Sequence, residues 1–143
     1  MSESPDARLV ELAHQMLDLA RSGDEERLTA YVAAGVPVDL TDAAGNTLLM
    51  LAAYHGHART VTVLADLGAD VDRTNDRGQT PLAGAVFKGE AEVVHALLSA
   101  GADPDAGAPT ARQSAAMFGQ TELLAGPAHR NPSSPPDSAN SSQ

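Results

Sequence analysis

Residues 45–56 read Gly-Asn-Thr-Leu-Leu-Met-Leu-Ala-Ala-Tyr-His-Gly, and residues 78–89 read Gly-Gln-Thr-Pro-Leu-Ala-Gly-Ala-Val-Phe-Lys-Gly. The second segment begins 33 positions after the first and repeats it in altered form. Self-similarity at a fixed period of this length is typical of chains built from stacked supersecondary units. This internal repeat therefore indicates a repeat architecture.

Two series of glycines extend the same register along the chain. The first series is Gly23, Gly56 and Gly89, and the second lies twelve residues further on in each unit, at Gly35, Gly68 and Gly101. Each glycine follows a short helical pattern, where a left-handed residue lets the chain leave a helix without a Cβ clash. The glycines thus predict at least three units. The Gly-Ala-Asp-x-Asp runs that begin at Gly68 and Gly101 then enter the next turn, where aspartates can accept bonds from nearby backbone amides.

The segment from Thr80 to Ala85 has the form Thr-Pro-Leu-x-x-Ala, which together with the period of 33 resembles the ankyrin-repeat family. The resemblance implies an all-α solenoid of about four helix-turn-helix repeats, with an N-terminal cap and a truncated C-terminal cap. The expected repeats cover about residues 8–40, 41–73, 74–106 and 107–126, within a domain of residues 1–126. The family's turn histidine is replaced by Met50 and Ala83, which leaves more of the stability to apolar packing.

The core follows from the helical spacing of the apolar residues. Leu49 and Leu82 occupy the same position of successive inner helices, where we expect them to be buried between neighbouring repeats. Small residues beside them, such as Ala52 and Ala85, allow those helices to approach closely. Arg112 stands at the corresponding place of the fourth repeat, which is why we expect that repeat to be a cap.

The first repeat has the features of the opposite cap. Ser4, Pro5 and Asp6 form a favourable helix start, and a helix should continue to Ser22. One face of that helix is apolar and should lie on the stack. Its residues are Leu9, Leu12, Ala13, Met16, Leu19 and Ala20.

Composition limits the functional classes. The formal charge of −10 argues against nucleic acid as a partner, because phosphate contacts need a basic surface. Acids cluster at the starts of the outer helices, at Asp24–Glu26 and at Glu90 and Glu92, where the helix dipole favours them. No membrane-length apolar stretch or basic leader is apparent, so we expect a cytoplasmic protein. Residues 127–143 are rich in proline and serine, and we expect a disordered tail.

The histidines do not form a convincing catalytic or metal-binding set. His55 and His57 form a His-x-His pair, which in a strand would direct two metal ligands to one face. Here the pair spans a helix end and Gly56, so the rings should diverge. His14 and His95 lie on helices of different repeats without a Ser or Cys nucleophile motif. We therefore expect no enzyme activity, no metal site and no cofactor.

The resemblance implies a concave groove formed by the turn tips and the ends of the inner helices. In this register one helix-end position recurs in every repeat, and large side chains with polar neighbours gather around it. The predicted partner-binding residues are Arg21, Tyr54, Phe87 and Met117 in the row itself, His55, Lys88 and Phe118 beside it, and Asn46, Arg77 and Gln79 on the turn tips. The same rings could instead only cover the neighbouring repeat, since spacing leaves both possibilities open.

These features favour a monomeric protein–protein interaction module that binds one partner without chemistry. A groove that is aromatic, polar and mildly basic suits a protein segment with apolar anchors and one or two acids. Two alternatives remain. The protein could inhibit or regulate a partner enzyme, or it could be an assembly element that associates with itself through the ends of the stack.

Overall fold

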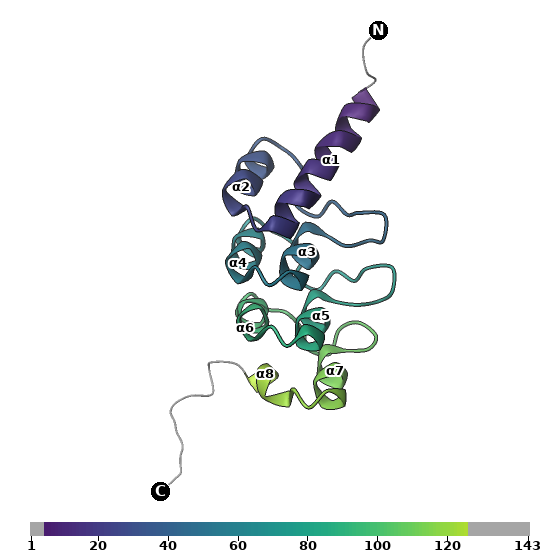
Figure 1. Ribbon diagram of the computed structural model, residues 1–143, viewed down its shortest axis with the longest axis vertical. Helices are drawn as coiled ribbons and strands as arrows, with labels where there is room; N and C mark the ends of the chain where they lie inside the picture. Colours follow the sequence, from purple (N-terminus) through teal and green to yellow (C-terminus); the bar gives the residue numbers. More distant parts are fainter. Residues whose placement is uncertain (1–4, 126–143) are drawn as a thin grey trace, which may run out of the picture.

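The computed structural model describes residues 5–125, which form eight helices in four antiparallel pairs (Figure 1). The inner row consists of α1 (Pro5–Ser22), α3 (Leu48–Tyr54), α5 (Pro81–Lys88) and α7 (Ala111–Met117). The outer row consists of α2 (Glu25–Ala33), α4 (Ala58–Asp66), α6 (Ala91–Ser99) and α8 (Thr121–Ala125). The predicted all-α repeat stack is confirmed.

No helix in the described range is both long enough and apolar enough to cross a membrane. Ser4 and the predicted tail at 127–143 lie outside the described residues.

A threonine begins each of the last three inner helices. Thr47, Thr80 and Thr110 have extended backbones, and each Oγ1 accepts the N–H of the residue three places on, at 3.1, 3.1 and 3.0 Å. In α7 the Gln113 side chain also accepts the Thr110 N–H at 2.9 Å, which completes a capping box. Because the same cap recurs at the same place, α3, α5 and α7 all start in the same register.

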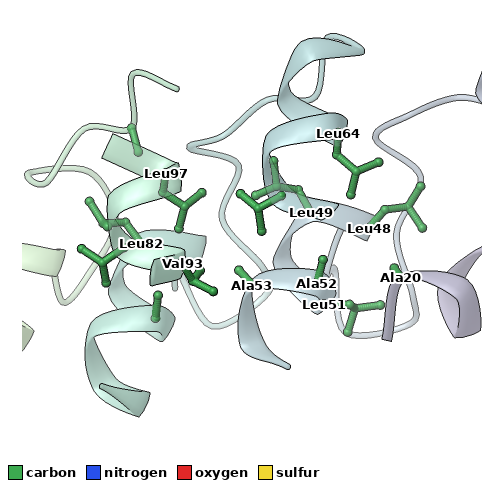
Figure 2. Close-up of a cluster of buried hydrophobic side chains, with 14 of the residues drawn as sticks. Ala20, Leu48, Leu49, Leu51, Ala52, Ala53, Leu64, Leu82, Val93 and Leu97 are labelled. Carbon is green, nitrogen blue, oxygen red and sulfur yellow. The ribbon is translucent and has the colours of Figure 1, made fainter. Parts of the chain in front are cut away.

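The core lies between the two rows of helices and between successive pairs. Leu49 and Leu82 are fully buried, which confirms their predicted position. Figure 2 shows Leu49 with Ala52 and Ala53 on one side of the junction and Leu82 on the other. The two alanines are also fully or almost fully buried. Their small side chains let α3 and α5 lie close together, so that the leucines of adjacent repeats share one continuous core.

The glycine turns are left-handed, as predicted, but at Gly23 a close contact adds a second reason for glycine. Gly23 has φ +77°, and a Cβ there would lie 2.6 Å from Nδ1 of His57. Nε2 of His57 lies 2.7 Å from the carbonyl oxygen of Arg21, at the end of α1. The imidazole of the second repeat thus fits over the glycine of the first, where a Cβ would force the ring to move.

The aspartates after the second glycine series join neighbouring repeats as well as shaping their own bends. Oδ1 of Asp70 accepts the N–H of Asp72 at 3.0 Å, and Oδ1 of Asp103 accepts that of Asp105 at 2.9 Å. The same segments bond across repeats: Asp39 accepts the Asp70 N–H at 3.1 Å, and Asp72 accepts the Asp103 N–H at 2.9 Å. The bends were predicted, but the bonds between repeats are visible only in the fold.

Helix α1 ends at Ser22 as predicted, but its first turns do not lie on the stack. Met16 and Ala20 are fully buried, whereas Leu9 is 63% exposed and Val10 is 55% exposed. The prediction that Leu9 faces the core was wrong, because α1 has 18 residues and its neighbour α3 has only seven. The N-terminal half of α1 therefore projects beyond the stack (Figure 1).

The fourth pair is a cap, as its sequence suggested. Arg112 is exposed where Leu49 and Leu82 are buried, since no further inner helix follows α7 within residues 5–125. Its guanidinium forms a two-pronged bond to Asp105, with Nε to Oδ1 at 2.8 Å and Nη2 to Oδ2 at 3.2 Å. These bonds lower the pKa of Asp105. A charged side chain at the leucine position thus lets α7 face water.

Candidate functional site

The predicted turn-tip residues are held in place by one side chain in each turn. Oδ1 of Asp42 accepts the N–H groups of Ala44 and Asn46, both at 2.9 Å. Asn75, 33 positions later, accepts those of Arg77 and Gln79 at 2.9 and 3.1 Å. Asx side chains commonly close tight turns in this way. The two tips therefore have the same shape and present Asn46 and Gln79 from equivalent places.

The donors around Asp42 also determine its charge state. Partial burial disfavours its ionised form, but the bonds from the backbone and side chain of Asn46 and from the backbone of Ala44 outweigh this effect. The pKa of Asp42 is consequently lower than its ordinary value. The carboxylate is thus charged and occupied by its own turn at neutral pH.

Neighbouring turn tips are bonded to one another. The Asp76 N–H donates to the Ala44 carbonyl at 2.9 Å, and Nδ2 of Asn75 donates to Oδ1 of Asn46 at 3.0 Å. The third tip joins this series because the Ala108 N–H donates to the Gly78 carbonyl at 2.9 Å. The tips thus form one connected wall instead of separate loops.

The opposite wall is formed by the ends of the inner helices. Tyr54, Phe87 and Met117 are each the seventh residue after a threonine cap, and they are 39%, 54% and 69% exposed. The repeated cap register explains why these large side chains recur at one place. Tyr54 and Met117 are the last residues of α3 and α7, and Phe87 is the last but one of α5. Tyr54 and Phe87 line the same hollow as the turn tips, whereas Met117 lies outside that lining.

The turn tips and helix ends enclose a groove of about 430 Å³, which we call the aromatic groove. Its lining residues are Asn46, Met50, Leu51, Tyr54, Arg77, Gln79, Phe87 and Pro109. Five of these eight belong to the predicted partner-binding set. A volume of this size can hold one or a few side chains.

Three residues of the groove were not predicted. Met50 and Leu51 form its floor from within α3 and are only 3% and 7% exposed. The sequence showed them only as part of a helix that is apolar nearly all round. Pro109 comes from the shortened fourth turn, and its approach to the groove depends on how the repeats stack.

The other predicted residues lie beside the groove or farther away. The ammonium of Lys88 lies 4.3 Å from the centre of the Tyr54 ring, and the His55 ring meets the same ring edge to face at 5.8 Å. Phe118 packs against Phe87 in a T-shaped pair with the ring centres 5.2 Å apart. Arg21 lines a different hollow, between α1 and the turn at 41–44, and it pairs with Asp18 at 2.8 Å.

The groove carries positive charge on an acidic molecule. Within residues 5–125, Arg21, Arg27, Arg59 and Arg112 pair with carboxylates, whereas Arg77 and Lys88 make no ion pair. Partial burial is the main reason for the lowered pKa of His55. The positive charges of His57, Lys88 and Arg21 lower it further. Two cations that make no ion pair within this range, Arg77 and Lys88, thus lie at the groove of a molecule whose net charge is −10.

The His55 and His57 rings have separate surroundings, as their positions in the sequence suggested. His57 contacts the end of α1, and His55 packs on Tyr54. Among the described residues, no group of three or more His, Asp or Glu side chains is arranged to hold a metal ion. The groove is therefore characterised by aromatic rings, side-chain amides and cationic side chains, and not by a cluster of metal ligands.

Comparison with known proteins identifies the repeats. A family model described as ankyrin repeats, in three copies, matches residues 16–108. A curated protein of Pseudomonas aeruginosa that is named for its ankyrin repeats is 47% identical over 65 residues, which amount to 43% of this chain and 38% of that protein. The chain thus spans well under two thirds of this relative's length. Ankyrin repeats are in general protein–protein interaction modules whose stacked units create extended binding surfaces.

Proposed function

Because the chain belongs to the ankyrin-repeat family, we propose that it is a non-catalytic module that binds a partner protein through the aromatic groove. The observation that carries this proposal is the exposure of Tyr54 and Phe87 along one groove. Large apolar side chains gathered on a surface are costly in water and often mark binding sites. Aromatic residues are also the most frequent anchors of protein interfaces.

The alternative use of these rings is to cover the neighbouring repeat. Phe87 packs on Phe118, and Tyr54 contacts His55 and Lys88. Yet Phe87 remains 54% exposed and Tyr54 39% exposed despite these contacts. Packing inside the stack therefore leaves a large part of each ring available to a partner.

In this proposal the protein acts in the cytoplasm as a monomer. Light scattering of the purified protein would test whether it is monomeric.

The test compares three forms of the protein: wild type, Tyr54→Ala/Phe87→Ala, and the control Leu9→Ala/Val10→Ala. The control removes two exposed apolar side chains from the projecting half of α1, away from the groove. Partners would be captured from a native lysate, identified by quantitative mass spectrometry and then purified for calorimetry. We expect the control to bind like wild type. The groove variant should lose about 2 kcal/mol or more of binding free energy.

Circular dichroism of each form would check that the fold is intact. A folded groove variant that binds every partner with wild-type affinity would refute the proposal. Unfolding of that variant would instead make the rings part of the core, and it would remove the main support for the groove as a binding site.

A further inference from the structure

Three hydrogen-bond donors at the aromatic groove have no acceptor within the described part of the chain. The guanidinium of Arg77 makes neither an ion pair nor a side-chain hydrogen bond, and the ammonium of Lys88 contacts only the Tyr54 ring. Gln79 uses its Oε1 to accept a long bond from Asn75 at 3.5 Å, while its Nε2 donates to no residue. The groove is thus supplied with donors that its own chain leaves unused.

Two acceptors of the turn tips, by contrast, are already engaged. Oδ1 of Asn46 accepts from Asn75, and the Asp42 carboxylate accepts three bonds from its own turn. A ligand that offers mainly donors would find these two acceptors already occupied. A ligand that offers carboxylates and carbonyl oxygens would satisfy the free donors.

Between the donors, the groove is apolar. The floor consists of the almost fully buried Met50 and Leu51, and the rings of Tyr54 and Phe87 line the helix side. Arg77 and Gln79 approach from the turn side, and Lys88 lies over Tyr54 on the helix side. An apolar side chain fits the floor, and oxygen acceptors fit the two edges.

Building on the proposed function, we propose that the occupant of the aromatic groove is an extended acidic protein segment. One apolar side chain of the segment enters over Met50 and Leu51, and flanking carboxylates pair with Arg77 and Lys88. The pKa of His55 is lowered first by partial burial and then by the positive charges of His57, Lys88 and Arg21, and this second cause agrees with the arrangement. Complementary charge of this kind selects among partners more than it adds affinity.

The test selects short random peptides displayed on phage against the full chain. The same selection is run on Arg77→Glu/Lys88→Glu, on Tyr54→Ala/Phe87→Ala, and on the control Arg73→Glu. Arg73 is exposed, makes no ion pair within residues 5–125 and does not line the groove, so it controls for a charge reversal outside the groove. Fluorescein-labelled copies of the selected peptides are then titrated against each form by anisotropy.

We expect wild type to select peptides with an apolar residue flanked by Asp or Glu. Reversal of both charges should weaken their binding about tenfold or more, and it should shift selection towards Lys and Arg. The Arg73→Glu variant should bind like wild type. Because Arg77 and Lys88 are exposed side chains, the reversed form should keep its helical circular dichroism.

Two outcomes would contradict the inference in different ways. Peptides that need Tyr54 and Phe87 but are neutral or basic, or that bind the charge-reversed form equally well, would overturn the acidic partner and leave the groove as the binding site. If no selected peptide depends on Tyr54 and Phe87, the proposed function fails together with the inference.

Discussion

At the scale of single residues, the repeats are joined by specific polar contacts as well as by apolar packing. His57 contacts the Arg21 carbonyl at 2.7 Å, and Asn75 donates to Asn46 at 3.0 Å. These two contacts connect residues 36 and 29 positions apart. They fix how one helix pair is placed on the next, which apolar packing alone would specify less strictly.

We predict that Gly23→Ala is more destabilising than Gly119→Ala. Both glycines are left-handed, with φ +77° and +66°, so each substitution should cost ~1–3 kcal/mol of folding free energy from backbone strain. At Gly23 the new Cβ would also displace the His57 ring, whereas nothing lies within 4 Å of the Cβ position at Gly119. Urea denaturation followed by circular dichroism would measure both. Equal losses would show that the imidazole moves away without cost.

The charge around the helix ends predicts how His55 titrates. Burial comes first among the causes that lower its pKa, and the charges of His57, Lys88 and Arg21 follow. Lys88→Gln should therefore raise the pKa of His55 towards its ordinary value, as measured by NMR titration of the imidazole. In the wild type, the pKa of His55 is lower in the folded state than in the unfolded state. The protein is therefore destabilised as the pH falls through the interval between these two pKa values, because the unfolded state binds the proton first. An unchanged midpoint in Lys88→Gln would contradict the assigned proximity.

At the scale of elements, helix length decides which part of a helix belongs to the core. The inner helices α3, α5 and α7 have seven or eight residues; α3 and α5 pack between two other inner helices, and α7 packs against α5. Helix α1 has 18 residues, and only its C-terminal part contacts this short-helix stack. The apolar periodicity of α1 therefore continues past the end of the core that it faces.

We expect this division of α1 to appear in stability measurements. Met16→Ala should cost about 2 to 5 kcal/mol, because it leaves a cavity at a fully buried position. Leu9→Ala should change the stability by less than about 0.5 kcal/mol, because most of that side chain is already in water. Both values can be obtained from urea denaturation. A large loss for Leu9→Ala would show that the projecting turns are covered in solution.

At the scale of the whole molecule, residues 5–125 form a one-dimensional stack in which each helix pair packs mainly against its neighbours. Stability in such a stack depends on the junctions between pairs as much as on the pairs themselves. Leu49 and Leu82 lie at adjacent junctions and belong to one continuous core. A defect in a central pair should therefore weaken both of its neighbours.

Leu82→Ala tests this cooperativity. The substitution should cost about 2 to 5 kcal/mol, and the loss should appear in all four helix pairs because the α5 junctions support both sides of the stack. Native-state hydrogen exchange would resolve the pairs one by one. Loss of protection confined to α5 and α6 would show that the repeats unfold independently.

The sequence by itself determined the period, the helical class and the buried positions of Leu49 and Leu82. These features depend on local rules, since caps, left-handed glycines and helical spacing act within one repeat. The common position of Tyr54, Phe87 and Met117 followed from the same rules. Whether these side chains bind a partner stays a prediction.

The tertiary structure decided the features that depend on which repeat lies next to a given side chain, namely its burial and its contact partners. It exposed Leu9, brought Met50 and Leu51 under the groove, and seated His57 over Gly23. Within residues 5–125 it also left Arg77 and Lys88 without carboxylate partners, whereas four arginines form ion pairs: Arg21, Arg27, Arg59 and Arg112. Local sequence rules cannot supply this information, because burial and pairing depend on contacts between residues that are distant in the chain and close only after the repeats have stacked.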